Sequence, residues 1–483
     1  MRVLILLLLL FLPVLAETEP PDWRWAPRWT LERVLARPEA FLDDFVRGER
    51  PFFRATRHPQ SGLTYDGWNL DPLTGSPIGP RLHSAPSKEC LDVAILTKAI
   101  LGDRRALMLV DEDEAVDILR RKLQSYRDWT RRYPRSGGYM PWWYGGHSAE
   151  FTPSWNGAVP ALDNGEWVWT MLVAEKALRD RGYARLAEEY HEFNDQLMDA
   201  SARIFYDDEK GRVRGDVRVD KPPYVPDPGK QGYLDGEHGV HEGVMMVMFV
   251  TLFGKDLPPD ASQRIWSGTN MVRVETPWGT TWQGFWGSSH EEWAYLFMPY
   301  FELPEYRKLF TIRQVIRTQN AAMRGYRGLH ASIHDPVTGN YVSDCGIEGV
   351  GTQKLKAQHA LALYGAFPVL MADRTAGSAW LYNMLCAPRM QGPMGGGESV
   401  SNDGRHAMPV KTIDGTFPLL LAAMGGFHRE TAATLRERGV LEEFKAIMRE
   451  EYREAFGDLP LRREADFALP PSPVPWALPD YAW

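Results

Sequence analysis

The sequence predicts an all-α protein, an (α/α)6 toroid in which paired helices close into a ring and long loops at one end form the site. The chain of 483 residues carries roughly a dozen segments whose apolar residues recur at helical spacing. The connections between them alternate between short and long, and strands do not alternate with helices. No repeat of about 34 or 40 residues is visible, which disfavours a conventional solenoid.

The first 16 residues are typical of a cleavable secretory signal. Arg2 supplies a positive start, residues 3–12 are apolar, and Val14 and Ala16 occupy the two positions where a cleavage site requires small residues. The mature chain would then begin near Glu17, and the protein would be secreted or periplasmic.

Residues 17–483 are expected to form a single catalytic domain, because no linker is visible. Its proline-rich C-terminal tail, residues 457–483, is expected to wrap the surface. No other apolar run is long enough to cross a bilayer, which predicts no stable membrane association. We expect a monomer.

The expected helices follow from apolar spacing and from charged residues at their ends. A hairpin is expected within residues 324–352, with Asp335–Gly339 as its turn. In chain order the helices are 30–45 (which Pro38 can divide), 87–101, 111–133, 163–178, 184–205, one from about 242, 288–300, 307–323, 354–371, 376–386, 413–424 and 431–456.

Composition excludes several classes of function. The net charge of −8 argues against a nucleic-acid partner. No glycine-rich phosphate loop follows a strand signal, so we expect no nucleotide and no other cofactor. A zinc HExxH motif is absent around His241, because the fourth residue after it is Met245, and we expect no metal. The three cysteines, whether joined in one disulfide or all free, are Cys90, Cys345 and Cys386.

Aromatic residues are the informative excess, with 18 Trp and 19 Tyr. Many lie in polar, glycine-rich stretches, where a flat side chain suits the apolar face of a sugar ring. Trp143, Trp282 and Trp286 are therefore candidate platforms for stacking sugars. The alternative is that such residues anchor the core or stabilise long loops.

Acidic residues recur just before or at the start of apolar helical segments. Glu237 and Glu242 precede the apolar run 244–253, and Asp414 precedes another. Asp163 and Glu166, three residues apart, share one face of a helix. Glu291 and Glu292 precede a further apolar segment. Simple helix capping explains any one of these acids, but four recurrences together indicate a pocket lined with carboxylates.

Such a pocket suits glycoside hydrolysis, which needs one acid to protonate the leaving oxygen and one carboxylate as base or nucleophile. The histidines near the acids, His241 among them, are expected to hydrogen-bond sugar hydroxyls or the acids themselves. Glu237 is likewise a candidate for binding substrate.

The chain resembles the glycoamylase-like group of glycoside hydrolases, which includes the bacterial endo-β-1,2-glucanases. The resemblance covers most of the mature chain. It is carried by SGLTYDGW (61–68), LDNGEWVWTMLVAEKAL (162–178), GVHEGVMMVMFVTLFG (239–254), WGSSHEEWAYLFMP (286–299), RGLHASIHDPVTGNY (327–341) and IDGTFPLLLAAM (413–424).

This resemblance implies an (α/α)6 barrel that hydrolyses a neutral glucan, with β-1,2-linked glucan the leading substrate. By position it implies Glu242 as the acid, with Asp414 or the pair Asp163 and Glu166 as its partner. The group includes inverting hydrolases, in which a substrate hydroxyl relays the proton, and retaining transglycosylases, so the stereochemistry stays open.

The sequence therefore predicts an exported glycoside hydrolase that cuts β-1,2-glucan internally. Glu242 is the expected general acid and Asp414 the expected base. Asp163, Glu166 and Glu292 are expected to position water and substrate. Two alternatives remain: a polysaccharide lyase on the same fold, and a non-catalytic glycan-binding protein.

Overall fold

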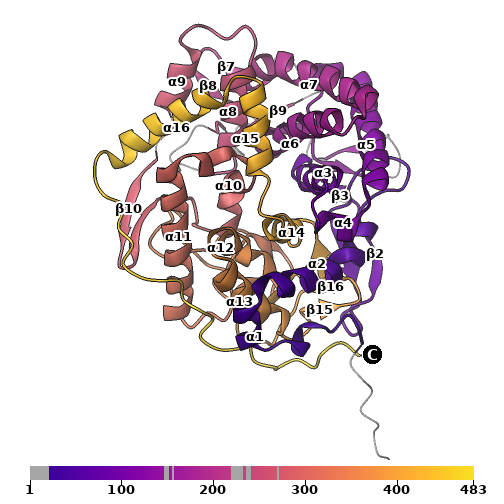
Figure 1. The fold of residues 1–483 in the computed structure, drawn as a ribbon, viewed down its shortest axis with the longest axis vertical. Helices are drawn as coiled ribbons and strands as arrows, with labels where there is room; N and C mark the ends of the chain where they lie inside the picture. Colours follow the sequence, from indigo (N-terminus) through magenta and orange to yellow (C-terminus); the bar gives the residue numbers. More distant parts are fainter. Residues whose placement is uncertain are drawn as a thin grey trace, which may run out of the picture.

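The computed structural model describes residues 21–145, 152–154, 157–218, 232–234, 241–268 and 271–482. Within them, helices form two concentric layers around a common axis (Figure 1). The inner helices are α3 (Pro86–Ile100), α6 (Ala161–Asp180), α8 (Val244–Phe253), α10 (Trp293–Phe297), α12 (Phe367–Ala372) and α14 (Phe417–Ala423). Among the inner helices, α3 contacts α6, α6 contacts α8 and α10, α10 and α12 each contact α14, and α14 returns to contact α3, which closes the ring. The (α/α)6 prediction is confirmed.

The inner helices are buried on almost every side, because they pack against each other and against the outer layer. In α3, for example, every residue but one is buried. Close packing between α6 and α8 depends on Gly165, because a Cβ there would lie 2.6 Å from the backbone nitrogen of Met246. A side chain at that position would push the two helices apart.

The outer helices are α2 (Pro38–Ala55), α5 (Glu112–Arg132), α7 (Ala184–Phe205), α11 (Pro304–Met323), α13 (Arg374–Leu385), α15 (His428–Glu437) and α16 (Leu441–Phe456). Except for α13, which is buried along most of its length, the outer helices show the alternation of buried and exposed residues expected of elements with one face in water. Shorter helices are α1 (Leu31–Ala36), α4 (Ala106–Leu109) and α9 (Ala261–Ser267).

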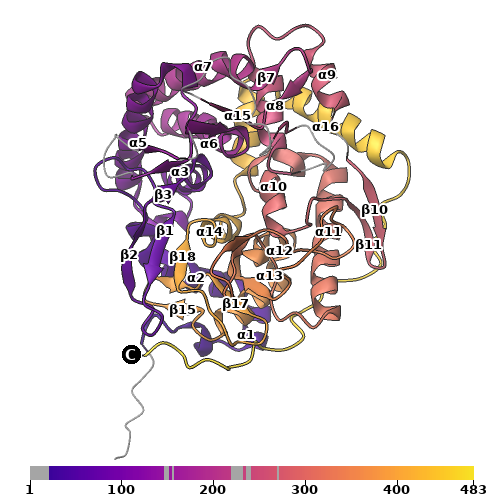
Figure 2. The ribbon, with the colours of Figure 1, turned by 180° about the vertical axis from the view of Figure 1, so that it is seen from behind.

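Short antiparallel strands connect the helices, most of them at the end of the ring that faces the viewer in Figure 2. β1 (Gly67–Leu70) lies between β2 (Pro77–Arg81) and β18 (Val410–Thr412). The other pairs and triplets are β3 (His83–Ser84), β4 (Trp143–Tyr144) and β5 (Thr152–Pro153); β6 (Ala158–Pro160) and β9 (Asp216–Arg218); β7 (Tyr206–Asp207) and β8 (Arg212–Val213); β10 (Arg273–Thr276) and β11 (Gly279–Trp282); β12 (Ile333–His334) and β13 (Tyr341–Val342); β14 (Ala360–Ala362) and β17 (Ser399–Ser401); β15 (Gln391–Gly392) and β16 (Gly395–Gly396).

The pairing of β1 with β18 brings together two distant parts of the chain. Gly67 faces Thr412, and the backbone N–H of Ile413 donates to the carbonyl of Asp66 at 2.9 Å. A Cβ at Gly67 would lie 2.0 Å from the carbonyl oxygen of Lys411, so this approach requires glycine. The contact sets the stretch before β1 beside the stretch that leads into α14.

Several helix predictions are confirmed, and three differ from the structure. Pro38 does divide the first predicted helix, because it begins α2. The predicted helix 288–300 is instead two 3-10 turns, η4 (Ser289–Glu292) and η5 (Pro299–Glu302), on either side of α10. Residues 354–362 are not helical, and η6 (Leu363–Ala366) precedes α12. The predicted helix 431–456 is divided at Gly439, whose φ of 76° ends α15.

The predicted hairpin forms from β12 and β13, and the carboxylate of Asp335 accepts the N–H of Val337 in its turn. The tail contacts distant segments, for example through Asp480, which pairs with Arg24 at 2.7 Å. All three cysteines are free thiols. None of the helices in the described part of the chain is both long and apolar enough to cross a membrane.

Candidate active site

A cavity of about 550 Å³ lies at the loop end of the ring, within the size range of ligand sites. Each of the inner helices described above contributes to it from its N-terminal end or from the loop before it. The lining residues include Ser87 and Lys88 at α3, Asp163 and Glu166 at α6, Glu242 before α8, Trp286, His290 and Trp293 at α10, Tyr364 before α12, and Asp414 before α14. The starts of six helices therefore meet at one pocket. The unpaired N–H groups at these helix starts favour negative charge there.

Glu242 lies in the turn that leads into α8, and its side chain is 16% exposed. Burial raises the pKa of Glu242 well above its usual value, and neighbouring carboxylates, Asp163 foremost, raise it further. The described residues place no cation within salt-bridge distance of Glu242. Its closest basic neighbour is His290, whose Nε2 lies 3.5 Å from Oε1. The protonated form is therefore favoured near neutral pH.

His290 is neutral under ordinary conditions. Burial, reinforced by the charge of Arg317, lowers the pKa of His290 to about 3. Its Nδ1 lies 2.6 Å from the hydroxyl of Ser332, which fixes the plane of the ring. His290 thus contacts Glu242 without drawing the proton from it.

Glu166 is a second buried carboxyl beside Glu242. Its side chain is inaccessible, and its hydrogen-bond partner among the described residues is the carboxyl of Glu242. Burial raises the pKa of Glu166 well above its usual value, and the charge of Glu242 adds to this rise. Two buried carboxyls at close range favour a state in which they hold a proton between them.

Asp414 differs from both glutamates because a lysine pairs with it. Lys88 Nζ lies 2.6 Å from Asp414 Oδ2. Burial raises the pKa of Asp414, while the charge of Lys88 opposes that rise. The other oxygen, Oδ1, is buried and has no hydrogen-bond partner among the described residues.

Asp66 completes the charged cluster at this side of the cavity. Arg81 Nε donates to its Oδ2 at 2.7 Å, and Lys88 lies 3.9 Å from Oδ1. Although burial alone would raise it, the pKa of Asp66 is held below its usual value by Lys88 and Arg81. His334 reaches the same cluster, with Nε2 at 3.0 Å from Arg81 and Nδ1 at 3.1 Å from the buried carboxylate of Glu398.

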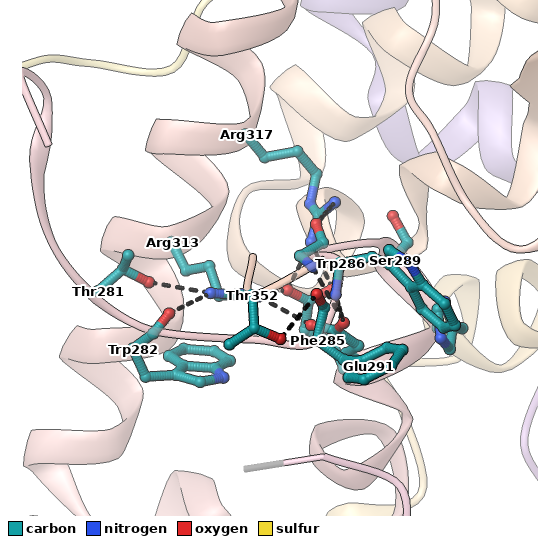
Figure 3. Close-up of polar contacts among 12 residues, drawn as sticks. Thr281, Trp282, Phe285, Trp286, Ser289, Glu291, Arg313, Arg317 and Thr352 are labelled. Atoms are coloured by element: carbon teal, nitrogen blue, oxygen red, sulfur yellow. Dashed lines mark hydrogen bonds and ion pairs between the residues drawn. The ribbon is translucent and has the colours of Figure 1, made fainter. Parts of the chain in front are cut away.

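A buried ionic network behind the cavity fixes the segment that carries Trp286 and His290 (Figure 3). Glu291 accepts the backbone N–H groups of Trp286 at 2.6 Å and Gly287 at 3.0 Å. Arg313 of α11 pairs with Glu291 and Glu292, and it also donates to the carbonyl of Trp282 at 2.8 Å. The segment is therefore held through its backbone, which leaves Trp286 to line the cavity.

The cavity brings together five of the residues predicted from sequence. Glu242, Asp414, Asp163, Glu166 and Trp286 all line it. Asp163 accepts the hydroxyl of Ser87 at 2.6 Å, so its position is set by the start of α3. His241 lies next to this group and accepts the N–H of Gly243 through Nδ1, but it does not line the cavity. Glu237 lies outside the described residues.

Two of the predicted tryptophans, Trp143 and Trp282, lie away from the cavity, each for a local reason. Trp143 is fully buried in the core, and its neighbour Trp142 lines the cavity instead, since adjacent residues of an extended chain point to opposite sides. Trp282 is also inaccessible and lies under the guanidinium of Arg313, 3.9 Å from the ring centre.

Glu292 was predicted to position water and substrate, but the structure places it in the network behind the cavity. It is inaccessible and pairs with Arg313 at 2.7 Å and Arg317 at 2.5 Å. Because η4 is a 3-10 turn, His290 and Trp293 face the cavity and the two glutamates between them face α11. Neither glutamate therefore lines the site.

Several residues that line the cavity were not predicted as site residues from the sequence. Tyr341 and Tyr364, for example, lie in no sequence pattern that indicates a functional site. Lys88 gave one signal, because a lysine in the first turn of a helix is opposed by the helix dipole and therefore needs a compensating anion. Among the described residues, no cluster of three or more His, Cys, Asp or Glu is arranged to hold a metal ion.

Comparison with known proteins gives one family match. The family described as endo-β-1,2-glucanase SGL matches residues 63–483. A comparison with curated proteins gave no match.

The solved structures that resemble this chain include endo-β-1,2-glucanases. The chain is similar to an endo-β-1,2-glucanase from Talaromyces funiculosus in complex with sophorose, at 29% identity and a TM-score of 0.88, over 94% of this chain and 98% of that one. A mutant of that enzyme in complex with β-1,2-glucan matches at 28% identity with the same TM-score and coverage. An endo-β-1,2-glucanase from Chitinophaga pinensis shares the fold, at 13% identity and a TM-score of 0.61, over 85% of this chain and 98% of that one.

Proposed function

The chain belongs to the endo-β-1,2-glucanase SGL family of glycoside hydrolases, and from this premise we propose that Glu242 and Asp414 cleave β-1,2-glucan as general acid and general base. The observation that carries this assignment is the unequal distribution of cations in the cavity. Lys88 pairs with Asp414, whereas the described residues bring no cation to Glu242. Burial raises the pKa of both carboxyls, but only at Asp414 does a cation oppose the rise, so Asp414 is the carboxyl that ionises more readily, and acid–base hydrolysis requires such a difference.

The reaction follows from this difference. Protonated Glu242 supplies its proton to the bridging oxygen, directly or through a substrate hydroxyl, as the bond from that oxygen to the anomeric carbon breaks. A water molecule attacks the anomeric carbon, and Asp414 accepts the proton that this water loses. Asp414 ends protonated and Glu242 ionised, and exchange with solvent restores both.

The remaining lining residues suit a neutral sugar chain. Trp142, Trp286 and Trp293 offer apolar faces, and Ser343 offers a hydroxyl group. Most charged residues in the cavity form ion pairs with one another, as Arg81 does with Asp66. A free cation that would bind an acidic polysaccharide is therefore missing from the part of the lining that the structure describes, which favours a neutral glucan over a uronate polymer.

Product analysis tests the proposal. The protein would be incubated with β-1,2-, β-1,3- and mixed-linkage β-glucans, an α-glucan and an acidic polysaccharide, and the products would be separated by thin-layer chromatography. A ladder of short oligosaccharides from β-1,2-glucan alone is the expected result. Cleavage of another polymer, or products with the ultraviolet absorbance of a new double bond, would contradict it.

We further propose that the protein is exported and acts as a monomer. The apolar segment after Arg2 and the small residues Val14 and Ala16 support export. Cell fractionation followed by N-terminal sequencing is expected to find the protein outside the cytoplasm, starting near Glu17. Light scattering of the purified protein is expected to give a mass below the 55.0 kDa of the full chain, and a multiple of it would contradict the monomer.

A further inference from the structure

We propose that Lys88 is a positioning residue that makes Asp414 a base, by binding its carboxylate at Oδ2 and favouring the ionised form that accepts the proton of the attacking water. This inference rests on the proposed function, because it requires Asp414 to accept a proton. It adds a role for a residue that neither acid–base chemistry in general nor the spacing of the acids predicts.

The position of Lys88 is the first observation. It lies in the first turn of α3, where the helix dipole disfavours a positive charge, and its side chain is only 12% exposed. Two carboxylates compensate: Asp414 at 2.6 Å and Asp66 at 3.9 Å. Although burial opposes the charged form, these anions raise the pKa of Lys88 above its usual value, so the ammonium group persists throughout the working range.

The two oxygens of Asp414 give the second observation. Oδ2 accepts the ammonium group of Lys88, whereas Oδ1 is buried and accepts no hydrogen bond from the described residues. A buried carboxylate oxygen without a donor is unfavourable, and Asp414 lines the cavity. Because Oδ1 is shielded from water, the exposed 14% of the Asp414 side chain lies elsewhere, and the ion pair at Oδ2 is the contact that favours the ionised carboxylate.

Asp66 fixes Lys88 in turn. Arg81 holds Asp66 from one side, and the backbone contact between Asp66 and Ile413 ties this aspartate to the strand before Asp414. Lys88 thus lies between two carboxylates whose relative position is set by the pairing of β1 and β18. The arrangement commits the ammonium group to Asp414 rather than to Glu242, which keeps the acid and the base distinct.

Other titratable groups also act on Asp414, so the charge of Lys88 must be separated from theirs by experiment. Burial and the negative charges around it raise the pKa of Asp414, and Lys88 is the cation that opposes them. The groups that face it are Lys88 of α3, Asp66 before β1, Asp163 and Glu166 of α6, Glu242 before α8, Tyr341 of β13 and Tyr364 of η6.

The test is the pH profile of Lys88→Met, which removes the charge and keeps most of the side-chain volume. The pKa of Asp414 should rise when Lys88 no longer opposes burial, so Asp414 would remain protonated to a higher pH. We expect kcat on β-1,2-glucan to fall by about 100-fold or more at neutral pH. The acidic limb of the kcat profile should move to higher pH, and raising the pH should restore part of the activity.

A matched control is available on the same helix. Lys98 is also buried in α3 and forms one close ion pair, with Glu430 at 2.5 Å, but it does not line the cavity. Lys98→Met is expected to lower thermal stability and to leave the pH limb unchanged. An equal displacement in both variants, or an unchanged limb in Lys88→Met, would overturn the proposal.

Two further variants keep the test decisive. If Lys88→Met does not fold, Lys88→Gln serves instead: it also removes the charge beside Asp414, so the acidic limb should again move to higher pH, and an unchanged limb would overturn the proposal. In an Asp414→Asn background, Lys88→Met should cause no further loss, because the lysine acts through that carboxylate. Full activity of Asp414→Asn alone would instead refute the proposed base, which separates the two failures.

Discussion

Replacing Glu242 by glutamine tests the proposed acid with little change in shape. The variant removes the transferable proton, while the side chain keeps its size and its place beside His290. General acid catalysis contributes about 10²- to 10⁴-fold. At about 1.36 kcal/mol for each factor of ten, we expect the barrier to rise by roughly 2.7 to 5.4 kcal/mol.

The assay is the release of reducing ends from β-1,2-glucan, together with cleavage of a nitrophenyl β-sophoroside. A nitrophenolate leaves without protonation, so Glu242→Gln should lose far less activity on this substrate than on the polymer. Glu430→Gln is the matched control, since Glu430 is similarly buried, at 20% exposed against 16% for Glu242, but lies outside the cavity. Equal losses on both substrates, or full activity on glucan, would refute the role as acid.

Thermal stability gives an independent measurement on the same variant. Burial raises the pKa of Glu242 in the folded protein, so the folded state binds a proton that the unfolded state releases above its own pKa of about 4.3. The carboxyl therefore lowers stability at neutral pH. Glu242→Gln is expected to melt at a higher temperature than the wild type at pH 7, with the difference vanishing below about pH 4.

Three other outcomes follow from the site. Trp142→Ala should mainly raise KM, because Trp142 lines the cavity and packs in a small cluster with Ala85 and Ala158. Trp143→Ala should cost about 3 to 5 kcal/mol of folding free energy, because Trp143 is inaccessible and lies in the main core. Denaturant unfolding and steady-state kinetics distinguish them, and reversed effects would contradict the placement. Glu292→Gln should also cost about 3 to 5 kcal/mol, since it leaves Arg313 and Arg317 buried beside a neutral group, and an unchanged unfolding midpoint would contradict this. If Asp414 activates water in a single displacement, the first product formed from the β-linkage is the α-anomer, which NMR of early time points detects; an initial β-anomer would indicate a covalent intermediate.

Local sequence patterns predicted most helices because each pattern reflects forces that act within one segment. The period of apolar residues in α5 and α7 identifies the buried face, and Pro38 marks a helix start that no tertiary contact is needed to explain. Where backbone geometry depends on partners elsewhere, the patterns were insufficient. The stretch 288–300 forms 3-10 turns around α10, with the glutamates of η4 bound to the arginines of α11.

The sequence by itself determined that acids would lie at the starts of buried helices, and that some of them would share a pocket. Glu242, Asp414, Asp163 and Glu166 were found in this way because helix starts favour negative charge and the ring places inner-helix starts at one end. The tertiary structure alone decided their roles. Lys88 meets Asp414 only because β1 pairs with β18 and α14 returns to α3, and the same closure brings no cation among the described residues to Glu242. Protonation depends on the distance to opposite charge and on burial, which are properties of the folded chain.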